Sequence, residues 1–271
     1  MSDWLEVSAP AKVNLALVVG PTRADGKHEV ATVLERVALA DTLGLRETDA
    51  TTVDGFPDDT LVRAALDAVR AASGTPARFA ARLVKRIPVA AGLGGGSSDA
   101  GAALTAANGL LPRPLDTETL HGIAAEIGSD VPFFLGPPVA IARGRGEILE
   151  PGPRLPPCAL VLAHPGRPLA TRDVYEAFEP HGPVPERIPP VSTLHALAAL
   201  VTNDLGTVAE ELEPACASLR EALLARGALA AQVTGSGSAV FGLFPDVDAA
   251  DGALDGLRDA AWSARATLRE P

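Results

Sequence analysis

The chain has 271 residues, of which 47% are hydrophobic and 21% charged, and its formal net charge is -11. This composition is typical of a globular protein with a packed core and excludes a disordered chain. The acidic balance opposes binding to nucleic acid and to anionic membrane surfaces, so we expect a small-molecule ligand. The N-terminus lacks a secretory pattern and no apolar run reaches the roughly 18 residues of a membrane helix, so we expect a cytoplasmic protein.

The first half of the chain alternates strand-like and helical runs. Residues 12–19 (KVNLALVV) and 79–87 (FAARLVKRI) predict strands, and the apolar spacing from Leu61 predicts a helix over 61–73. A second helix is expected after the glycines at 92–96, because apolar residues follow at helical spacing: Ala100, Ala103, Leu104, Ala107 and Leu111. Ser97, Ser98 and Asp99 are suited to the cap and first turn of that helix.

Two proline clusters, at 150–157 and 179–190, interrupt the second half. The first marks the expected domain boundary, giving domains 1–150 and 151–271. Beyond it we expect a strand in 158–166, helices near 192–202 and 208–226, a strand-rich segment at 230–244 and a last helical run at 246–262. Because the elements lack the regular alternation of doubly wound folds, the expected class is α+β in two lobes.

The cysteines and histidines predict neither a disulfide nor a zinc site. Cys158 and Cys216 have no metal-ligand spacing, and we expect them to be buried free thiols. The five histidines form no H-x-x-x-H pair. We therefore expect no metal ion held by the protein's own side chains.

The segment GLGGGSSDAG, from Gly92, fits neither familiar phosphate-binding pattern. A dinucleotide fingerprint fails because the position of its third glycine holds Ser97 or Asp99, and a Walker A loop fails because no lysine follows Lys85 within the motif. Glycines before a helix still allow several backbone amides to converge on an anion, which the helix dipole favours. We expect this segment to bind phosphate; the alternative is that it is a flexible turn with a helix cap.

Two further motifs make the interpretation of this segment more specific. Residues 88–98 (PVAAGLGGGSS) resemble the ATP-binding motif of the GHMP kinase superfamily, and residues 9–15 (APAKVNL) and 233–239 (VTGSGSA) resemble its other two motifs. Further segments resemble the 4-diphosphocytidyl-2-C-methyl-D-erythritol kinases of that superfamily: 23–29, 128–134, 144–147, 164–166 and 203–205. One departure is Lys27, which stands where that family has tyrosine.

The resemblance implies a two-lobed GHMP kinase fold, with an N-terminal lobe like domain 2 of ribosomal protein S5 and a ferredoxin-like C-terminal lobe. It implies transfer of the γ-phosphoryl group of ATP to the 2-hydroxyl of 4-diphosphocytidyl-2-C-methyl-D-erythritol, a step of non-mevalonate isoprenoid precursor synthesis. Such transfer depends on positioning and charge stabilisation. By resemblance Lys12 pairs with Asp130, which accepts or orients the hydroxyl proton. Strand periodicity separately predicts that Lys12 and Asn14 share one face of their strand.

The remaining site residues are also carried over from the family. Those expected to bind ATP are Lys85 at the adenosine end, together with Pro88, Gly92, Leu93, Gly94, Gly95, Gly96, Ser97 and Ser98 at the phosphates. Those expected to bind the alcohol substrate are Asn14, Lys27, His28, Thr171, Tyr175, Gly235 and Ser236, with His28 reading the cytidine and Tyr175 stacking on it. Mg²⁺ is expected to arrive with ATP, with phosphates and waters as most of its ligands.

Alternatives remain for several of these features. Tyr175 could simply pack in the second lobe, Asp130 could cap a helix, and 235–237 could be a tight turn. At the level of function, the alternatives are a mevalonate- or homoserine-type kinase, or a ligand sensor without catalysis on the same scaffold. We expect a monomer or a weak homodimer.

Overall fold

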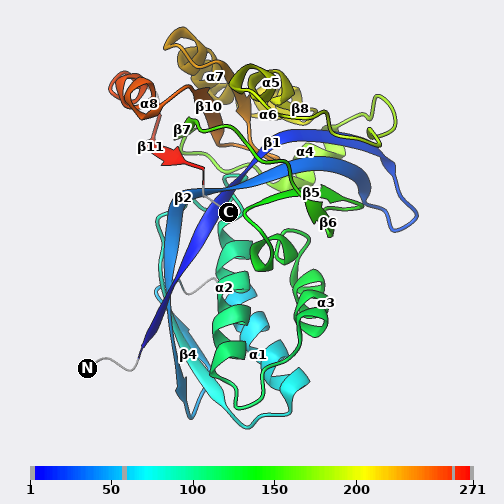
Figure 1. Ribbon diagram of the computed structural model, residues 1–271, viewed down its shortest axis with the longest axis vertical. Coiled ribbons are helices and arrows are strands. Elements are labelled where there is room, and N and C mark those ends of the chain that lie inside the picture. Colours follow the sequence, from blue (N-terminus) through cyan, green and yellow to red (C-terminus); the bar gives the residue numbers. More distant parts are fainter. Residues whose placement is uncertain (1–3, 57–59, 258–259, 269–271) are drawn as a thin grey trace. The chain divides into compact units, whose positions relative to one another are not determined.

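The computed structural model describes residues 4–56, 60–257 and 260–268. Its contacts divide the chain into two compact units (Figure 1). Unit 1 consists of Met1–Ala11, Leu39–Ile87 and Gly94–Pro137, and unit 2 of Lys12–Ala38, Pro88–Leu93 and Pro138–Pro271. The long strands β1 (Leu5–Thr22) and β2 (His28–Thr48) contribute residues to both units.

Unit 1 is a small sheet covered by helices. Strand β4 (Arg78–Val84) pairs antiparallel with residues 42–48 of β2 and parallel with β3 (Thr52–Asp54). Figure 1 shows the helices of this unit gathered on one side of β4 and β2: α1 (Leu61–Ser73), α2 (Gly95–Leu110) and α3 (Thr117–Ile127). A short 3-10 turn, η1 (Pro132–Leu135), follows α3.

The core of unit 1 forms where the apolar stripes of its helices meet. Helix α1 buries Val62, Ala65, Leu66 and Val69, a spacing that places them on one face. Helix α2 buries the apolar positions expected from the sequence, including Ala103 and Leu104, against the same cluster. Small residues on α2 allow α1 to pack closely against it.

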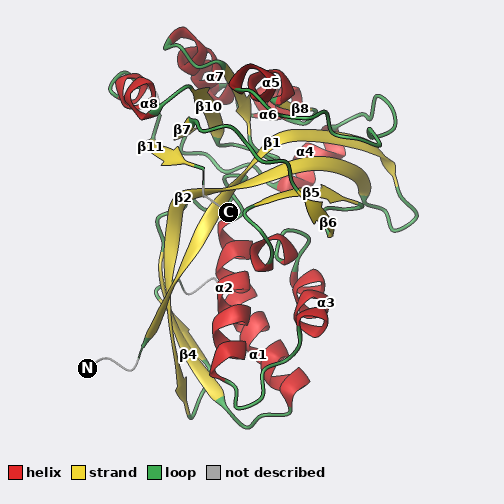
Figure 2. Ribbon diagram, in the orientation of Figure 1, coloured by secondary structure: helices red, strands yellow, loops and turns green. Residues whose placement is uncertain are grey.

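Unit 2 contains a four-stranded antiparallel sheet in the order β11-β7-β10-β9. These strands are β7 (Ala159–His164), β9 (Ala230–Val233), β10 (Val240–Phe244) and β11 (Trp262–Thr267). In Figure 2 the helices α7 (Ala215–Ala225) and α8 (Val247–Leu254) lie along these strands, and they share one core with them. Two βαβ halves in this strand order are the ferredoxin-like arrangement, so the expected two-lobed α+β fold is confirmed.

The other elements of unit 2 are short. Strand β5 (Val139–Arg143) joins residues 32–35 of β2 to β6 (Ile148–Pro151), and β8 (Thr202–Asn203) pairs with Ala16 and Leu17 of β1. Three short helices complete the unit: α4 (Thr171–Ala177), α5 (Leu194–Leu200) and α6 (Gly206–Leu212). The division of the sequence at 150 and 151 stays a prediction, because the compact units are not consecutive segments.

Several expected boundaries were wrong. The helix expected over 208–226 is two helices, α6 and α7, because Pro214 cannot continue the first and instead begins the second. The run at 246–262 is helical only to Leu254, and Trp262 starts β11; residues 258–259 lie outside the described residues. The strand expected at 12–19 extends over Leu5–Thr22, since both faces of its middle part are buried.

The start of α2 also differs from the expectation. The cap is Gly94, with φ +69°, and not one of the following polar residues. Ser97 and Ser98 lie within the helix, one turn in, and Asp99 lies further along and is buried. A left-handed cap without a side chain is natural for glycine, which tolerates positive φ.

Candidate active site

Three motifs that are far apart in the sequence meet around Lys12 in unit 2. The Lys12 ammonium donates to Asn14 Oδ1 (2.7 Å) and to the carbonyl of Gly92 (2.9 Å). Its backbone amide donates to the carbonyl of Leu93 (2.9 Å). A Cβ placed on Gly235 would lie 3.3 Å from Lys12 Nζ, so the third motif reaches the same point. The structure thus brings a lysine to a glycine loop that contains none.

The glycine loop and the third motif approach so closely that Gly92 admits no side chain. Gly92 has φ +77°, and a Cβ there would lie 2.1 Å from the carbonyl oxygen of Thr234. The amide of Ala239 donates to the carbonyl of Ala91 (3.0 Å), which holds the two segments together. Glycine at this position is therefore required by both backbone conformation and space.

Asn14 anchors the Lys12 ammonium to the core of unit 2. Its Nδ2 donates to Thr32 Oγ1 (2.8 Å), and the Thr32 hydroxyl donates to the carbonyl of Ala16 (2.6 Å). Its backbone amide donates to Thr234 Oγ1 (3.0 Å). Lys12 and Asn14 share one face of β1, as the strand period predicted. Because both amide atoms of Asn14 are engaged, its side chain orients Lys12 in this structure.

The third motif, around Gly235, is held by residues that the sequence places far away. Asn203 Nδ2 donates to the carbonyls of Val233 and Gly235, each at 2.8 Å. The hydroxyls of Ser236 and Thr171 are hydrogen-bonded to each other (2.9 Å). Two residues expected to bind the substrate therefore lie together, and Asn203 fixes the backbone next to them.

His164 braces the same loop from the other side. Its Nδ1 accepts from the amide of Gly166 (3.0 Å), so the ring proton is on Nε2, which donates to Ser238 Oγ (3.1 Å). The Ser238 hydroxyl in turn donates to the carbonyl of Arg167. Burial lowers the pKa of His164, which keeps the imidazole neutral and preserves this direction of hydrogen bonding.

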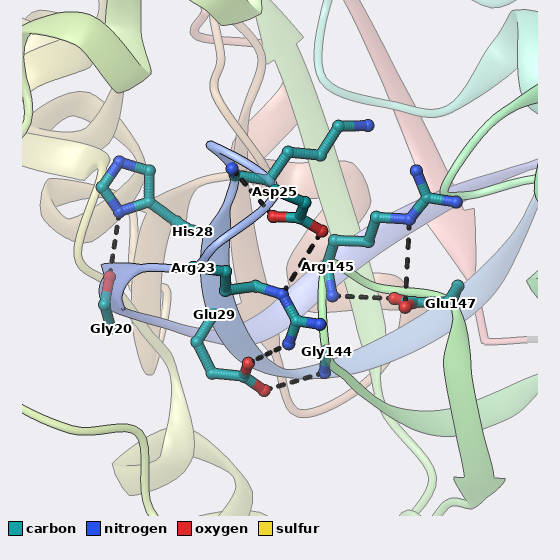
Figure 3. Close-up of polar contacts among 9 residues, drawn as sticks. Gly20, Arg23, Asp25, His28, Glu29, Gly144, Arg145 and Glu147 are labelled. Carbon is teal, nitrogen blue, oxygen red and sulfur yellow. Dashed lines mark hydrogen bonds and ion pairs between the residues drawn. The ribbon is translucent and has the colours of Figure 1, made fainter.

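The turn between β1 and β2 is tied to a second turn by charged side chains (Figure 3). Arg23 pairs with Glu29, whose other oxygen accepts from the amide of Gly144 (3.0 Å). Asp25 Oδ1 accepts from the amide of Lys27 (3.0 Å), and this hydrogen bond lowers the pKa of Asp25. The segments 23–29 and 144–147, which were recognised separately in the sequence, are therefore one structural cluster.

His28 and Tyr175 lie close together at the end of this turn. Their ring centroids are 5.6 Å apart. His28 Nδ1 is 2.9 Å from the carbonyl of Gly20, which can only accept, so Nδ1 carries the proton of the neutral ring (Figure 3). Tyr175 also packs beside Val174 and Phe178, so the structure accommodates both readings of this tyrosine.

In unit 1 the N-terminus of α2 offers unused donors. No side chain caps its first turn, whose N1 and N2 residues are Gly95 and Gly96. Within the described part of the chain, the buried Ser98 hydroxyl has no hydrogen-bond partner. Such donors at a helix N-terminus are suited to phosphate oxygens.

Lys85, expected at the adenosine end of ATP, is engaged by two buried carboxylates. Its ammonium lies 2.5 Å from Asp41 Oδ2 and 2.5 Å from Asp99 Oδ2. Burial opposes the charged ammonium, but the two carboxylates outweigh it and raise the pKa of Lys85. Lys85 is therefore a fixed cation in unit 1.

Asp130, the expected catalytic carboxylate, lies in the half-buried turn between α3 and η1. This turn packs on α2, since a Cβ on Gly101 would lie 2.8 Å from Phe134 Cβ and 3.7 Å from the carbonyl of Val131. Asp130 belongs to unit 1 and Lys12 to unit 2, so their pairing stays a prediction.

Sequence reasoning overlooked several residues that build these sites. His164, Asn203 and Glu29 lie inside segments that had been recognised, but no role followed from their position. Nothing in the sequence indicated that Thr32 and Asp41 belong to the site, because a single polar residue in an apolar strand does not reveal its hydrogen-bond partner.

The described residues contain no group of three His, Cys, Asp or Glu side chains able to hold a metal ion. Both cysteines are free thiols; Cys216 is buried as expected, whereas Cys158 is only partly buried. Over the same residues, no helix is both long and apolar enough to cross a membrane.

Comparison with known proteins agrees with this arrangement. The model of the GHMP kinase N-terminal domain matches residues 60–136, and that of the GHMP kinase C-terminal domain matches residues 191–263. A crystal structure of homoserine kinase from Cytophaga hutchinsonii matches 99% of this chain and 95% of its own, with a TM-score of 0.70 at 17% identity. That likeness shows a shared fold.

Other relatives are more similar. The 4-diphosphocytidyl-2-C-methyl-D-erythritol kinase of Pelobacter propionicus is 39% identical over 92% of both chains, and that of Anaeromyxobacter dehalogenans is 42% identical over 93% of this chain and 85% of its own. A crystal structure of a 4-(cytidine 5'-diphospho)-2C-methyl-D-erythritol kinase matches 98% of this chain and all of its own, with a TM-score of 0.85 at 37% identity. The chain therefore belongs to the GHMP kinases and, within them, to the family of 4-diphosphocytidyl-2-C-methyl-D-erythritol kinases.

Proposed function

We propose that this protein transfers the γ-phosphoryl group of ATP to the 2-hydroxyl of 4-diphosphocytidyl-2-C-methyl-D-erythritol. The observation that carries the proposal is the meeting of three family motifs at Lys12, which contacts Asn14 and Gly92 and lies against Gly235. The relatives at 39 and 42% identity bear the name of this kinase. The alignments cover 92 and 93% of this chain, which supports the same reaction for it.

The chemistry assigns different tasks to Lys12 and Asp130. Asp130 accepts or orients the proton of the substrate hydroxyl, and the Lys12 ammonium stabilises negative charge on the transferred phosphoryl group. Such a positioned base typically contributes about 10²- to 10⁴-fold in rate. Asn14 and the Gly92 carbonyl orient the Lys12 ammonium, so their part is positioning.

The phosphates of ATP would lie at the glycine loop and the start of α2. The uncapped amides of the first turn and the Ser98 hydroxyl are the unsatisfied donors that fit this role. Gly92, Leu93, Gly94, Gly95, Gly96, Ser97 and Ser98 would line the phosphate site, with Pro88 at its entrance. Mg²⁺ would come with ATP and draw most of its ligands from phosphates and waters.

The cytidine end of the substrate would lie at His28 and Tyr175. With its proton on Nδ1, the neutral His28 ring leaves Nε2 to accept from an amino group such as that of cytosine. Tyr175 would stack on the base, and Thr171, Gly235 and Ser236 would face the methylerythritol part. The alkyl stem of Lys27 could cover the face of the cytosine ring opposite Tyr175, or its ammonium could reach the diphosphate.

The test is ADP release by the purified protein with ATP·Mg²⁺ and a panel of alcohols. We expect turnover with the cytidylylated methylerythritol and only background with mevalonate or homoserine. The Asp130→Asn variant should lose turnover yet still bind ATP, which separates catalysis from folding. Equal turnover on mevalonate would refute the substrate assignment, and normal turnover by Asp130→Asn would refute the role of the carboxylate.

We also propose that the protein works in the cytoplasm, as a monomer or a weak homodimer. The net charge of -11 supports a freely diffusing enzyme by opposing adsorption to nucleic acid and anionic lipid. Sedimentation at micromolar concentrations tests the oligomeric state. A stable higher oligomer would contradict it.

A further inference from the structure

A buried ion cluster joins the two ends of the glycine loop. Lys85 lies three residues before Pro88, and Asp99 is on α2, just after the loop. Asp41, on β2, completes the cluster. The carboxylates of Asp41 and Asp99 are fully buried, and both lie 2.5 Å from the same ammonium.

Asp41 fixes the segment that enters the loop. Its Oδ1 accepts from the amides of Arg86 (2.5 Å) and Ile87 (2.9 Å), while Oδ2 contacts Lys85. One carboxylate thus orders three consecutive residues immediately before Pro88. Hydrogen bonds from backbone amides to a buried carboxylate are strong and directional.

Asp99 and Gly95 fix the segment that leaves the loop. Asp99 joins α2 to Lys85, and a Cβ on Gly95 would lie 3.1 Å from Ile87 Cγ2 and 3.4 Å from Lys85 Nζ. The first residue of α2 therefore packs directly on the cluster. Both ends of the loop are held at one place within unit 1.

We propose that Lys85, Asp41 and Asp99 form a positioning cluster that sets the geometry of the glycine loop, and that Lys85 is not a ligand of the nucleotide. The ammonium is already shared by two carboxylates, which leaves it little attraction for a third anion. The Lys85 side chain is only 16% exposed, and turning its ammonium toward a nucleotide would weaken its pairing with two fully buried carboxylates. This inference replaces the adenosine contact expected for Lys85, and it rests on the proposed use of the loop to bind ATP.

The decisive variant is Asp99→Asn, which keeps the shape of the side chain and removes the charge that holds Lys85 to α2. We measure ATP binding by calorimetry and the KM values for ATP and for the alcohol. A positioning role predicts roughly tenfold weaker ATP binding and a matching rise in the KM for ATP, with the KM for the alcohol unchanged. Lys85→Arg should restore most of the affinity lost in Lys85→Met, because arginine can still pair with both carboxylates.

A matched control is the ion pair between Arg220 of α7 and Glu210 of α6, where Arg220 Nε lies 2.5 Å from Glu210 Oε1. Arg220→Met should lower stability without changing ATP binding. If Asp99→Asn behaves like this control, the cluster is only structural and the proposal is wrong. If Lys85→Met weakens ATP binding and Asp99→Asn does not, Lys85 is a direct ligand and the proposal is equally wrong.

The failure of the proposed function would be a separate result. A wild-type protein that binds ATP but phosphorylates no alcohol in the panel contradicts the assigned reaction. The calorimetric comparison of the variants then still decides the role of the cluster, because it needs no alcohol. Wild-type protein with no ATP binding at all would overturn both.

Discussion

Replacing Gly92 by alanine should destabilise the protein more than the same substitution at a glycine with open space around it. At φ +77° an alanine costs about 1–2 kcal/mol, because its Cβ crowds the backbone in the left-handed region. The new Cβ would also lie 2.1 Å from the Thr234 carbonyl oxygen, which would have to retreat by about 1 Å. Forcing such a shift in a packed site typically costs about 1–3 kcal/mol.

Two other glycines separate these contributions. Gly74, the C-cap of α1, has φ +64° with no atom within 4 Å of an added Cβ, so Gly74→Ala should cost only the backbone term, about 1–2 kcal/mol. Gly109, near the end of α2, also has open space and is helical, so Gly109→Ala should stabilise by up to about 1 kcal/mol. The expected total for Gly92→Ala is about 2–5 kcal/mol.

The assay is urea unfolding of the three variants beside the wild type, followed by circular dichroism. We expect the urea midpoint to be highest for Gly109→Ala, lower for Gly74→Ala and lowest for Gly92→Ala. Gly92→Ala should also lower turnover, since the carbonyl of Gly92 accepts from Lys12. A Gly92→Ala variant as stable as Gly74→Ala would refute the close approach between the glycine loop and Thr234.

Burial raises the pKa of Cys158 and of Cys216 to about 12, so at pH 8 both thiols should react slowly with a thiol reagent until urea unfolds the chain; rapid reaction of the native protein would contradict this. Burial lowers the pKa of His164 below its ordinary 6.5. As the pH falls below about 6.5, the unfolded chain therefore takes up a proton at His164 more readily than the folded protein does, and the free energy of unfolding should decrease. His164→Gln should remove that loss from urea unfolding measured at pH 7 and pH 5, and an unchanged pH dependence would be evidence against it. Asn14→Leu should lower kcat by roughly 10- to 100-fold and Asn14→Asp by less, because aspartate keeps an acceptor for Lys12; equal kcat values for the two variants would oppose the positioning role.

Local patterns in the sequence predicted the parts of the fold that depend on period and composition. The shared face of Lys12 and Asn14 followed from strand alternation, and the buried stripe of α2 followed from helical spacing. The boundaries of α6 and α7 were missed although Pro214 was visible, because an apolar helical pattern continued on both sides of it. Period alone does not locate the end of a helix.

Candidate site residues that lie in a sequence motif were predicted, whereas contacts between residues far apart in the sequence were missed. The family resemblance pointed to Lys12, and in the structure its ammonium donates to the carbonyl of Gly92, in a loop that contains no lysine. The pairing of Lys85 with Asp41 joins residues 44 positions apart, and no local pattern encodes such a contact. Asp99 was expected in the cap or first turn of α2 because its residue type favours that position. Its burial results from the packing of α2, which no local pattern reveals.

A competition experiment identifies the alcohol that this kinase phosphorylates. The purified protein receives limiting ATP·Mg²⁺ with equal amounts of cytidylylated methylerythritol, mevalonate and homoserine, and ³¹P NMR identifies the product. We expect a new phosphomonoester signal on the 2-hydroxyl of the cytidylylated methylerythritol, with the other two alcohols unchanged. Phosphomevalonate or phosphohomoserine as the main product would contradict it.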